Sequence, residues 1–152
     1  LAGGFESMLV CDLVVAARNA QFGLPEVKRG LAAAAGGLMR LPRLIPQRIA
    51  MEMALTGDTV PAERLYPYGL FNALVEPGQA LDAAKQLARR ITANAPMSVA
   101  ASKRVIIEQR DWPTAEMFDR QEPITGPVLQ SQDAREGAAA FAERRAPQWR
   151  GV

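Results

Sequence analysis

The sequence predicts an α/β fold followed by an all-helical region, and two observations support this prediction. In the first part of the chain, short apolar and β-branched runs alternate with segments whose apolar residues recur every three or four positions. Beyond Pro77 only the helical spacing continues. We therefore expect an α/β layer arrangement in the first part of the chain and a helical region after it.

Two glycines open the first element of the chain. Gly3 and Gly4 permit a turn with unusual backbone angles, and the apolar residues after them are spaced as on one face of a short helix. The segments that follow are an apolar strand buried on both faces at 13–17, a turn at 18–19, a short strand at 21–23 and a loop at 24–26.

Prolines and glycines mark the ends of the helices in the middle of the chain. Gly36 and Gly37 precede a helix predicted over residues 38–45, and Pro46 stands where a second helix can start. Gly57 then ends this second helix. The last elements of the α/β part are a short helix at 61–66 and a strand at 70–75.

The remainder of the chain is expected to form only helices. Residues 81–91 and 97–109 both show helical spacing, and Pro96 stands between them. The elements after these are a third helix from 114 to about 121, an interruption at Pro123, Gly126 and Pro127, and one or two helices within 128–145.

Composition excludes several kinds of active site. The chain has 49% apolar and 22% charged residues, as expected of a folded globular domain. It has no histidine, which excludes Ser–His and Cys–His nucleophile pairs and histidine-containing zinc sites. The single cysteine, Cys11, excludes an internal disulfide and a thiolate zinc cluster. Carboxylates are therefore the leading acid–base groups, with Lys and Tyr behind them.

Charge and hydropathy do not indicate a nucleic-acid or membrane partner. The net charge of +2 is too small to favour either on bulk charge, and the longest charge-free apolar stretch, residues 30–39, is too short to span a bilayer. A lone thiol mildly favours a reducing compartment, so we expect a cytoplasmic protein. The chain opens at Leu1 rather than at Met, which favours a piece of a longer protein.

Two glutamates are candidate acid–base residues. Glu6 follows Gly3 within a helix start, where unpaired N–H groups favour developing negative charge, and Glu26 lies in an otherwise apolar loop. Taken singly, each is better explained as a surface residue, Glu26 through pairing with Lys28 or Arg29. Because α/β units bring distant loops together, the two carboxylates together form a plausible acid–base pair.

Basic residues form the remaining candidate site. One cluster comprises Lys28, Arg29, Arg40, Arg43 and Arg48. It could steer an anionic ligand such as a phosphorylated cofactor, although such runs are more often solvated surface. Near the end of the chain, Arg144 and Arg145 could clamp phosphate or simply favour the negative end of the last helix.

Several motifs occur in one order along the chain. They include Ala2-Gly3-Gly4-Phe5-Glu6, the run from Cys11 to Ala16, Phe22-Gly23-Leu24-Pro25-Glu26, Gly36-Gly37, and the tail from Glu136 to Arg145. Each motif is loose alone, but the ordered set is specific, and it resembles the enoyl-CoA hydratase/isomerase, or crotonase, superfamily. The resemblance covers the whole chain and corresponds to the C-terminal portion of the family's sequence.

The resemblance implies an acyl-CoA thioester substrate and the addition of water to it. Family members stabilise an enolate-like thioester oxygen with two backbone N–H groups, of which one matches Gly3 and the other lies upstream. Glu6 and Glu26 match the two glutamates of the hydratase branch. In that mechanism Glu6 takes the water's proton for attack at the β-carbon, and Glu26 delivers a proton to the α-carbon. No metal or cofactor is implied beyond the coenzyme A that the substrate carries.

The resemblance also implies an assembly and leaves the substrate open. Residues 1–92 would form part of the crotonase spiral core, and residues 93–152 would assemble a homotrimer or a dimer of trimers. Phe141 and Arg144 match positions that approach the coenzyme A of a neighbouring subunit. A hydratase of fatty-acid β-oxidation is the leading interpretation. The alternatives are an enoyl-CoA isomerase using Glu26 alone, a carnitinyl-CoA dehydratase-like enzyme, and a non-catalytic acyl-CoA-binding or oligomerisation module. The 152 residues alone are expected to be inactive.

Overall fold

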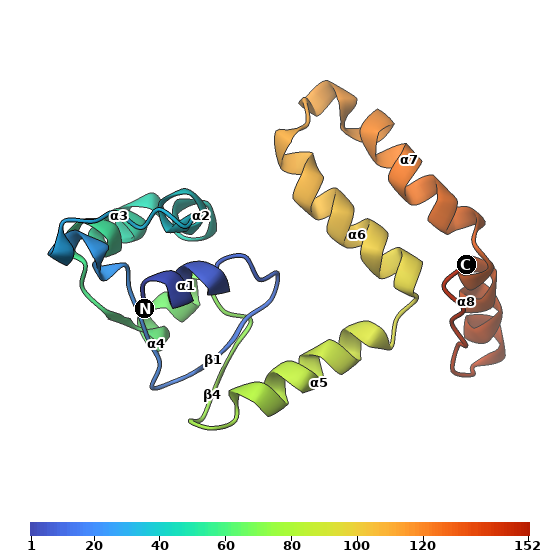
Figure 1. The fold of residues 1–152 in the computed structure, drawn as a ribbon. Coiled ribbons are helices and arrows are strands. Elements are labelled where there is room, and N and C mark those ends of the chain that lie inside the picture. The colour runs from blue at the N-terminus through green and yellow to red at the C-terminus, as the bar shows by residue number, and fades with distance from the viewer. The chain divides into compact units, whose positions relative to one another are not determined.

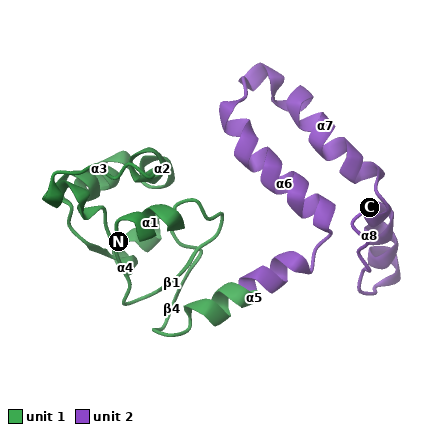
Figure 2. Ribbon diagram, in the orientation of Figure 1, with its two compact units in different colours: residues 1–86 green, residues 87–152 purple.

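The computed structural model describes residues 1–152 as two compact units, Leu1–Gln86 and Leu87–Val152 (Figure 2). The division falls inside helix α5 (Ala80–Thr92) rather than at its end. The assignment of separate roles to residues 1–92 and 93–152 stays a prediction. None of the helices combines the length and the apolar character that crossing a bilayer requires.

The first unit mixes short strands and helices, as the sequence predicts (Figure 1). Its elements are, in order, α1 (Gly3–Met8), β1 (Val15–Ala17), β2 (Gln21–Phe22), the 3-10 helix η1 (Pro25–Arg29), α2 (Gly37–Leu44), α3 (Gln47–Thr56), β3 (Val60–Pro61), α4 (Ala62–Leu65), the 3-10 helix η2 (Tyr66–Tyr68) and β4 (Ala73–Val75). The expected loop at 24–26 is therefore wrong in part, because Pro25 begins a 3-10 helix.

The strands form two small ladders. β1 pairs in parallel with β4, with Ala16 opposite Leu74, and β2 pairs antiparallel with β3. Beyond the β1–β4 ladder, Asn72 donates its N–H to the carbonyl of Val14, and its side-chain Oδ1 accepts the N–H of Val14, each at 2.7 Å. Because a side chain takes over this pairing, the strand predicted at 13–17 shortens to its last three residues. Of these only Ala16 is buried, so the expectation of burial on both faces is wrong.

One apolar core holds the first unit together. Its largest fully buried side chains come from α1, the segment before η1, α2, α3 and α4: Phe5, Leu24, Leu41, Met53 and Leu65. The ring of Phe22 lies between those of Phe5 and Phe71, with centroids 5.4 and 4.7 Å away. This core fixes α1 against the segment that leads into η1, and these two segments carry both candidate glutamates.

The second unit contains only helices, which confirms the prediction for this part of the chain. After α5 come α6 (Pro96–Glu108), the 3-10 helices η3 (Gln109–Asp111) and η4 (Thr114–Glu116), α7 (Met117–Gln130) and α8 (Gln132–Glu143). Helices α6 and α7 pack side by side in opposite directions (Figure 1). Residues 144–152 have no helix and return along α8.

The predicted interruption at Pro123, Gly126 and Pro127 is wrong. All three residues lie inside α7, which continues from Met117 to Gln130. A proline inside a helix removes one N–H donor, and its ring crowds the carbonyl four residues earlier, at a cost of about 3 kcal/mol. Ile124, buried between the two prolines, gives the segment an apolar anchor. Tertiary packing therefore outweighs the local preference here.

Candidate active site

Glu6 is a buried acid at the start of the chain. Helix α1 places its side chain in the interior, where it is 5% exposed, next to the fully buried Phe5. Its Oε1 accepts the backbone N–H of Gly37 at 2.8 Å, across 31 positions of sequence. Gly37 begins helix α2, and the first N–H groups of a helix have no partner within it. The simple explanation of Glu6 as a solvated helix residue is therefore wrong.

The segment that carries Glu26 lies directly beside the turn before α1 and the start of α2. Ala2 donates its N–H to the carbonyl of Gly23 at 2.9 Å, which joins the turn before α1 to the segment before η1. A Cβ built on Gly37 would lie 3.0 Å from Glu6 Oε1 and 3.1 Å from Leu24 Cδ2. The two loops that the sequence singled out are thus brought together, as expected of an α/β arrangement.

Glu26 has an unusual environment for an acid in a loop. Its side chain is half-buried, and its Oε2 is buried without a hydrogen-bond partner. An unpaired buried oxygen costs about 1–3 kcal/mol, so such an atom in a folded protein calls for an explanation, and substrate contact is one. The alternative pairing with Lys28 is wrong, because Lys28 binds Asp58 Oδ1 at 2.5 Å instead. No ion pair joins Glu26 to Arg29 either.

The 3-10 helix of Glu26 is fixed from one side by the end of α3. The Lys28–Asp58 ion pair is one link. Gly23 is the second, because a Cβ there would come within 2.9 Å of the carbonyl oxygen of Asp58. Gly57, directly after α3, is the third, because a Cβ there would lie 3.0 Å from side-chain atoms of both Val27 and Lys28. Glu26 is therefore carried by a segment with little freedom to move.

Gly3 occupies a turn that leaves its N–H available. The turn from Leu1 to Gly4 is closed by the Gly4 N–H, which donates to the carbonyl of Leu1 at 3.2 Å. The N–H groups of Phe5 and Glu6 donate to the carbonyl of Ala2, whereas Gly3 donates to no backbone carbonyl. Ala2 holds this turn with φ 51° and ψ −134°, a region that non-glycine residues rarely occupy. An unpaired backbone N–H is a donor that can bind an oxyanion.

The candidate coenzyme A residues lie in the second unit. Phe141 is 87% exposed on α8, and Arg144 is exposed at its end with φ 55°. Arg145 forms ion pairs with Glu136 and Glu143, both at 2.6 Å, so it is not a free phosphate clamp. Within the basic cluster of the first unit, Lys28 binds Asp58 and Arg40 donates to the carbonyl of Ala35 at 3.1 Å.

Sequence reasoning missed Gly37 as a partner of Glu6. The sequence predicts Gly36 and Gly37 as a helix start and includes them among the family motifs, but it assigns neither of them a contact with Glu6. The signal available was the double glycine itself, because a glycine at the first helical position exposes its N–H to any acceptor that packs closely. Which acceptor reaches it depends on tertiary packing.

Comparison with known proteins gives a consistent assignment. The family model described as enoyl-CoA hydratase/isomerase matches residues 1–152. An (E)-benzylidenesuccinyl-CoA hydratase from Thauera aromatica is 42% identical over 152 residues, which is 100% of this chain and 59% of that protein. A carnitinyl-CoA dehydratase from Salmonella arizonae is 40% identical over 156 residues, covering 98% of this chain and 59% of its own length.

Solved structures agree with these matches. An enoyl-CoA hydratase from Mycobacterium tuberculosis has a TM-score of 0.97 and 60% identity, with 99% of this chain and 60% of that chain covered. One from Mycobacterium marinum has the same TM-score and 57% identity, with the same shares covered. The crotonase-like α/β fold expected from the sequence is thereby confirmed. The chain spans about three fifths of the length of these relatives, and it belongs to the enoyl-CoA hydratase/isomerase family.

Proposed function

We propose that this chain carries the two acid–base residues of an enoyl-CoA hydratase, which adds water across the 2,3 double bond of an acyl-CoA thioester. The observation that supports this most is the contrast between the environments of Glu6 and Glu26, which lie in adjoining segments of the first unit. Glu6 is buried and held by the Gly37 N–H, while Glu26 in the adjoining segment has a buried oxygen without a partner. The N–H of Gly3 lies one turn of helix before Glu6.

In the proposed reaction, Glu6 accepts a proton from water as the water oxygen bonds to the β-carbon. Electrons move through the double bond onto the thioester oxygen, which takes enolate character. The Gly3 N–H and a second N–H, which the resemblance places outside residues 1–152, stabilise that oxygen. One such donor contributes about 3 kcal/mol in comparable sites. Glu26 then gives its proton to the α-carbon, so the product carries the added water, and a proton passes from Glu6 back to Glu26 before the next turnover.

The activities for which the relatives are named support the substrate class. One is a hydratase and the other a dehydratase, so the two names describe the addition and the removal of water, and both specify a coenzyme A thioester. We propose acyl-CoA thioesters as the substrates here too, with no further cofactor. The homotrimer or dimer of trimers, the place in fatty-acid metabolism and the cytoplasmic location stay predictions.

The test is removal of each carboxylate without change of shape. Glu6→Gln and Glu26→Gln, made in the protein that carries residues 1–152, should each lower hydration of a 2-enoyl-CoA by about 10²–10⁴-fold. Loss of absorbance from the conjugated double bond measures the rate. Glu63→Gln is the matched control, because Glu63 is an exposed partner of Arg18 and should leave the rate unchanged. Full turnover in either test variant would remove that carboxylate from the mechanism.

An isomerase is the second candidate, because the unpartnered oxygen belongs to Glu26, the acid that an isomerase would use. Under this alternative, Glu6→Gln would leave migration of a double bond from the 3,4 to the 2,3 position largely intact. A hydratase that uses both acids would lose hydration in the same variant. A non-catalytic module would bind coenzyme A and show neither activity in the unmodified protein.

A further inference from the structure

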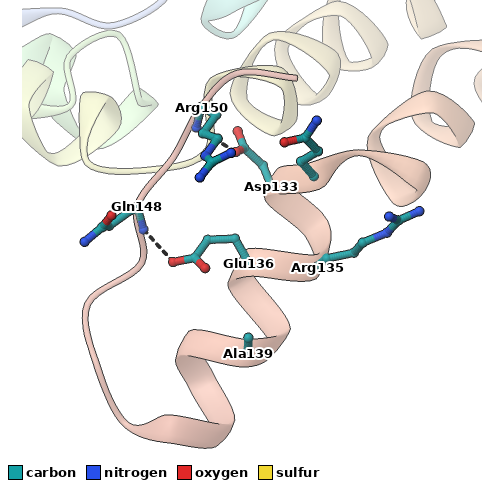
Figure 3. A pocket seen from close by; sticks show the side chains of 7 residues that line it. Asp133, Arg135, Glu136, Ala139, Gln148 and Arg150 are labelled. Atoms are coloured by element: carbon teal, nitrogen blue, oxygen red, sulfur yellow. Dashed lines mark hydrogen bonds between the residues drawn. The ribbon is translucent and has the colours of Figure 1, made fainter.

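The last residues of the chain form a strap over helix α8. We define this strap as residues 145–152, which follow the end of α8 at Glu143 and run back along it. Its first anchor is Arg145, whose two terminal nitrogens lie 2.6 and 2.9 Å from the two carboxylate oxygens of Glu136. The backbone N–H of Gln148 donates to the same carboxylate at 2.8 Å (Figure 3).

The strap has a second anchor at the start of α8. Asp133 is 2% exposed, and its two oxygens accept the backbone N–H groups of Arg150 and Gly151 at 2.7 and 2.9 Å. In return, the carbonyl of Val152 accepts the N–H of Gln132 at 2.8 Å. The strap is therefore hydrogen-bonded to α8 at the start of the helix and, one turn further on, at Glu136.

A third anchor links the strap to the segment before α6. The indole Nε1 of Trp149 donates to the carbonyl of Ala93 at 2.8 Å. The ring also lies against Gly137 of α8, where a built Cβ would be 3.4 Å from it. A cavity of about 350 Å³ remains between α8 and the strap, bordered by Glu136, Ala139 and Gln148 (Figure 3). The strap is thus held by separate anchors rather than by continuous packing. Loss of one anchor should therefore free the strap residues around it.

Arg144 stands at the junction between helix and strap in an unfavourable backbone conformation. It has φ 55° and ψ 39°, where glycine is the usual residue. The following residue, Arg145, donates its N–H to the carbonyl of Ala140 at 3.0 Å, and its guanidinium is the group that Glu136 binds. The Glu136–Arg145 pair therefore fixes the residue directly after Arg144, one turn of helix beyond Phe141.

We propose that Glu136 is a positioning residue for coenzyme A binding, acting through Arg145 to hold Arg144 and Phe141 in one orientation. This rests on the proposed function and on the family resemblance, which implies that Arg144 and Phe141 approach the coenzyme A of a neighbouring subunit. A guanidinium binds the phosphate groups of coenzyme A, and a phenyl ring offers a face to its adenine. Because both side chains are exposed, holding the backbone beneath them reduces the freedom that binding would otherwise have to remove.

The geometry favours a positioning role over a purely stabilising one. The side chains of Arg145 and Glu136 are 39% and 23% exposed, and ion pairs at such accessible sites add little to stability. A bidentate pair does add directional restraint, since two parallel hydrogen bonds fix the plane of the guanidinium. Arg144 and Phe141 are exposed, so this restraint of the backbone beside them would favour their contacts with the ligand.

The experiment measures the affinity of free coenzyme A by calorimetry in the protein that carries residues 1–152. Glu136→Gln should weaken binding about tenfold and raise KM for the acyl-CoA similarly, with kcat within twofold of the original. Arg145→Lys keeps the charge but loses the fork, and should weaken binding in the same direction while remaining folded. Glu116→Gln, which removes an exposed ion pair with Arg120 on α7, is the matched control and should bind as before.

A double variant separates positioning from general destabilisation. If Glu136 acts through Arg144, then Glu136→Gln should weaken binding no further once Arg144→Gln is present. An equal further loss in the double variant would overturn the proposal. So would normal binding by Glu136→Gln while Arg144→Gln binds weakly, and in that case the proposed coenzyme A contact would stand. Normal binding by both Arg144→Gln and Phe141→Ala would instead refute the contact itself.

Discussion

A methyl group added at Gly37 tests whether the close fit around Glu6 holds this site together. In Gly37→Ala the new Cβ would lie 3.0 Å from Glu6 Oε1, 3.1 Å from Glu6 Cγ and 3.1 Å from Leu24 Cδ2. Both neighbours are buried, at 5% and 1% exposure, so neither can move into solvent. Each would have to shift within the core, and Glu6 would move away from the Gly37 N–H, from which it accepts a hydrogen bond.

The expected change in the free energy of unfolding follows from two opposing terms. Overfilling a packed core costs about 1–3 kcal/mol, and the absence of free space on either side places Gly37→Ala in the upper part of that range. Replacing glycine by alanine in a helix returns up to about 1 kcal/mol. We therefore expect a net destabilisation of about 1–2 kcal/mol, with a loss of turnover as the carboxylate moves.

Urea unfolding followed by circular dichroism provides the measurement, and Gly4→Ala is the matched control. Gly4 also lies in a helix, but a Cβ there meets no atom within 4 Å. The control should gain up to about 1 kcal/mol in stability from the same chemical change. A Gly37→Ala protein as stable as the control would refute the argument that Glu6 and Leu24 leave no room.

Three further predictions concern other parts of the chain. Met53→Ala removes a side chain with 0% exposure and should lower the free energy of unfolding in urea by about 2–5 kcal/mol. Ala2→Gly relieves the backbone at φ 51° and should raise it by up to about 1 kcal/mol. Hydrogen bonds from Arg145 and from the Gln148 N–H lower the pKa of Glu136 from 4.5 to about 2. Its stabilising contribution, small at so accessible a site, is therefore complete above pH 4.5 and is lost as pH falls towards 2, so the small difference in Tm between the original protein and Glu136→Gln should shrink between pH 6 and pH 3.

Local signals predicted the ends of elements well. Pro46 precedes α3 and Gly57 ends it with φ 66°, because proline and glycine restrict or permit backbone angles wherever they stand. The prolines of α7 show the limit of the same reasoning. Pro123 and Pro127 predict an interruption between helices, but packing of Ile124 and contact with α6 keep α7 continuous. A local preference of a few kcal/mol is decided by surroundings that the sequence does not display.

Pairing across the chain was the part that the sequence could not show. The sequence identified Glu6 and Glu26 by residue type, but the partner of Glu6 is the Gly37 N–H, 31 positions away. Likewise Lys28 was a reasonable neighbour for Glu26, yet it binds Asp58, which is 30 positions further along. Ion pairs and hydrogen bonds at such separations depend on how the core sets the loops. The residue type can therefore identify a candidate acid, but only the fold shows which groups form hydrogen bonds or ion pairs with it.

The unequal hydrogen bonding of the two glutamates fits the division of labour in the proposed reaction. With Oε1 of Glu6 occupied by the Gly37 N–H, the other oxygen of that carboxylate is the one left to accept a proton from water. Glu26 accepts no hydrogen bond at its buried Oε2, so that oxygen can carry a proton and donate it to carbon. The fixed N–H of Gly37 is therefore the feature that, in this proposal, makes Glu6 the base and leaves Glu26 as the acid.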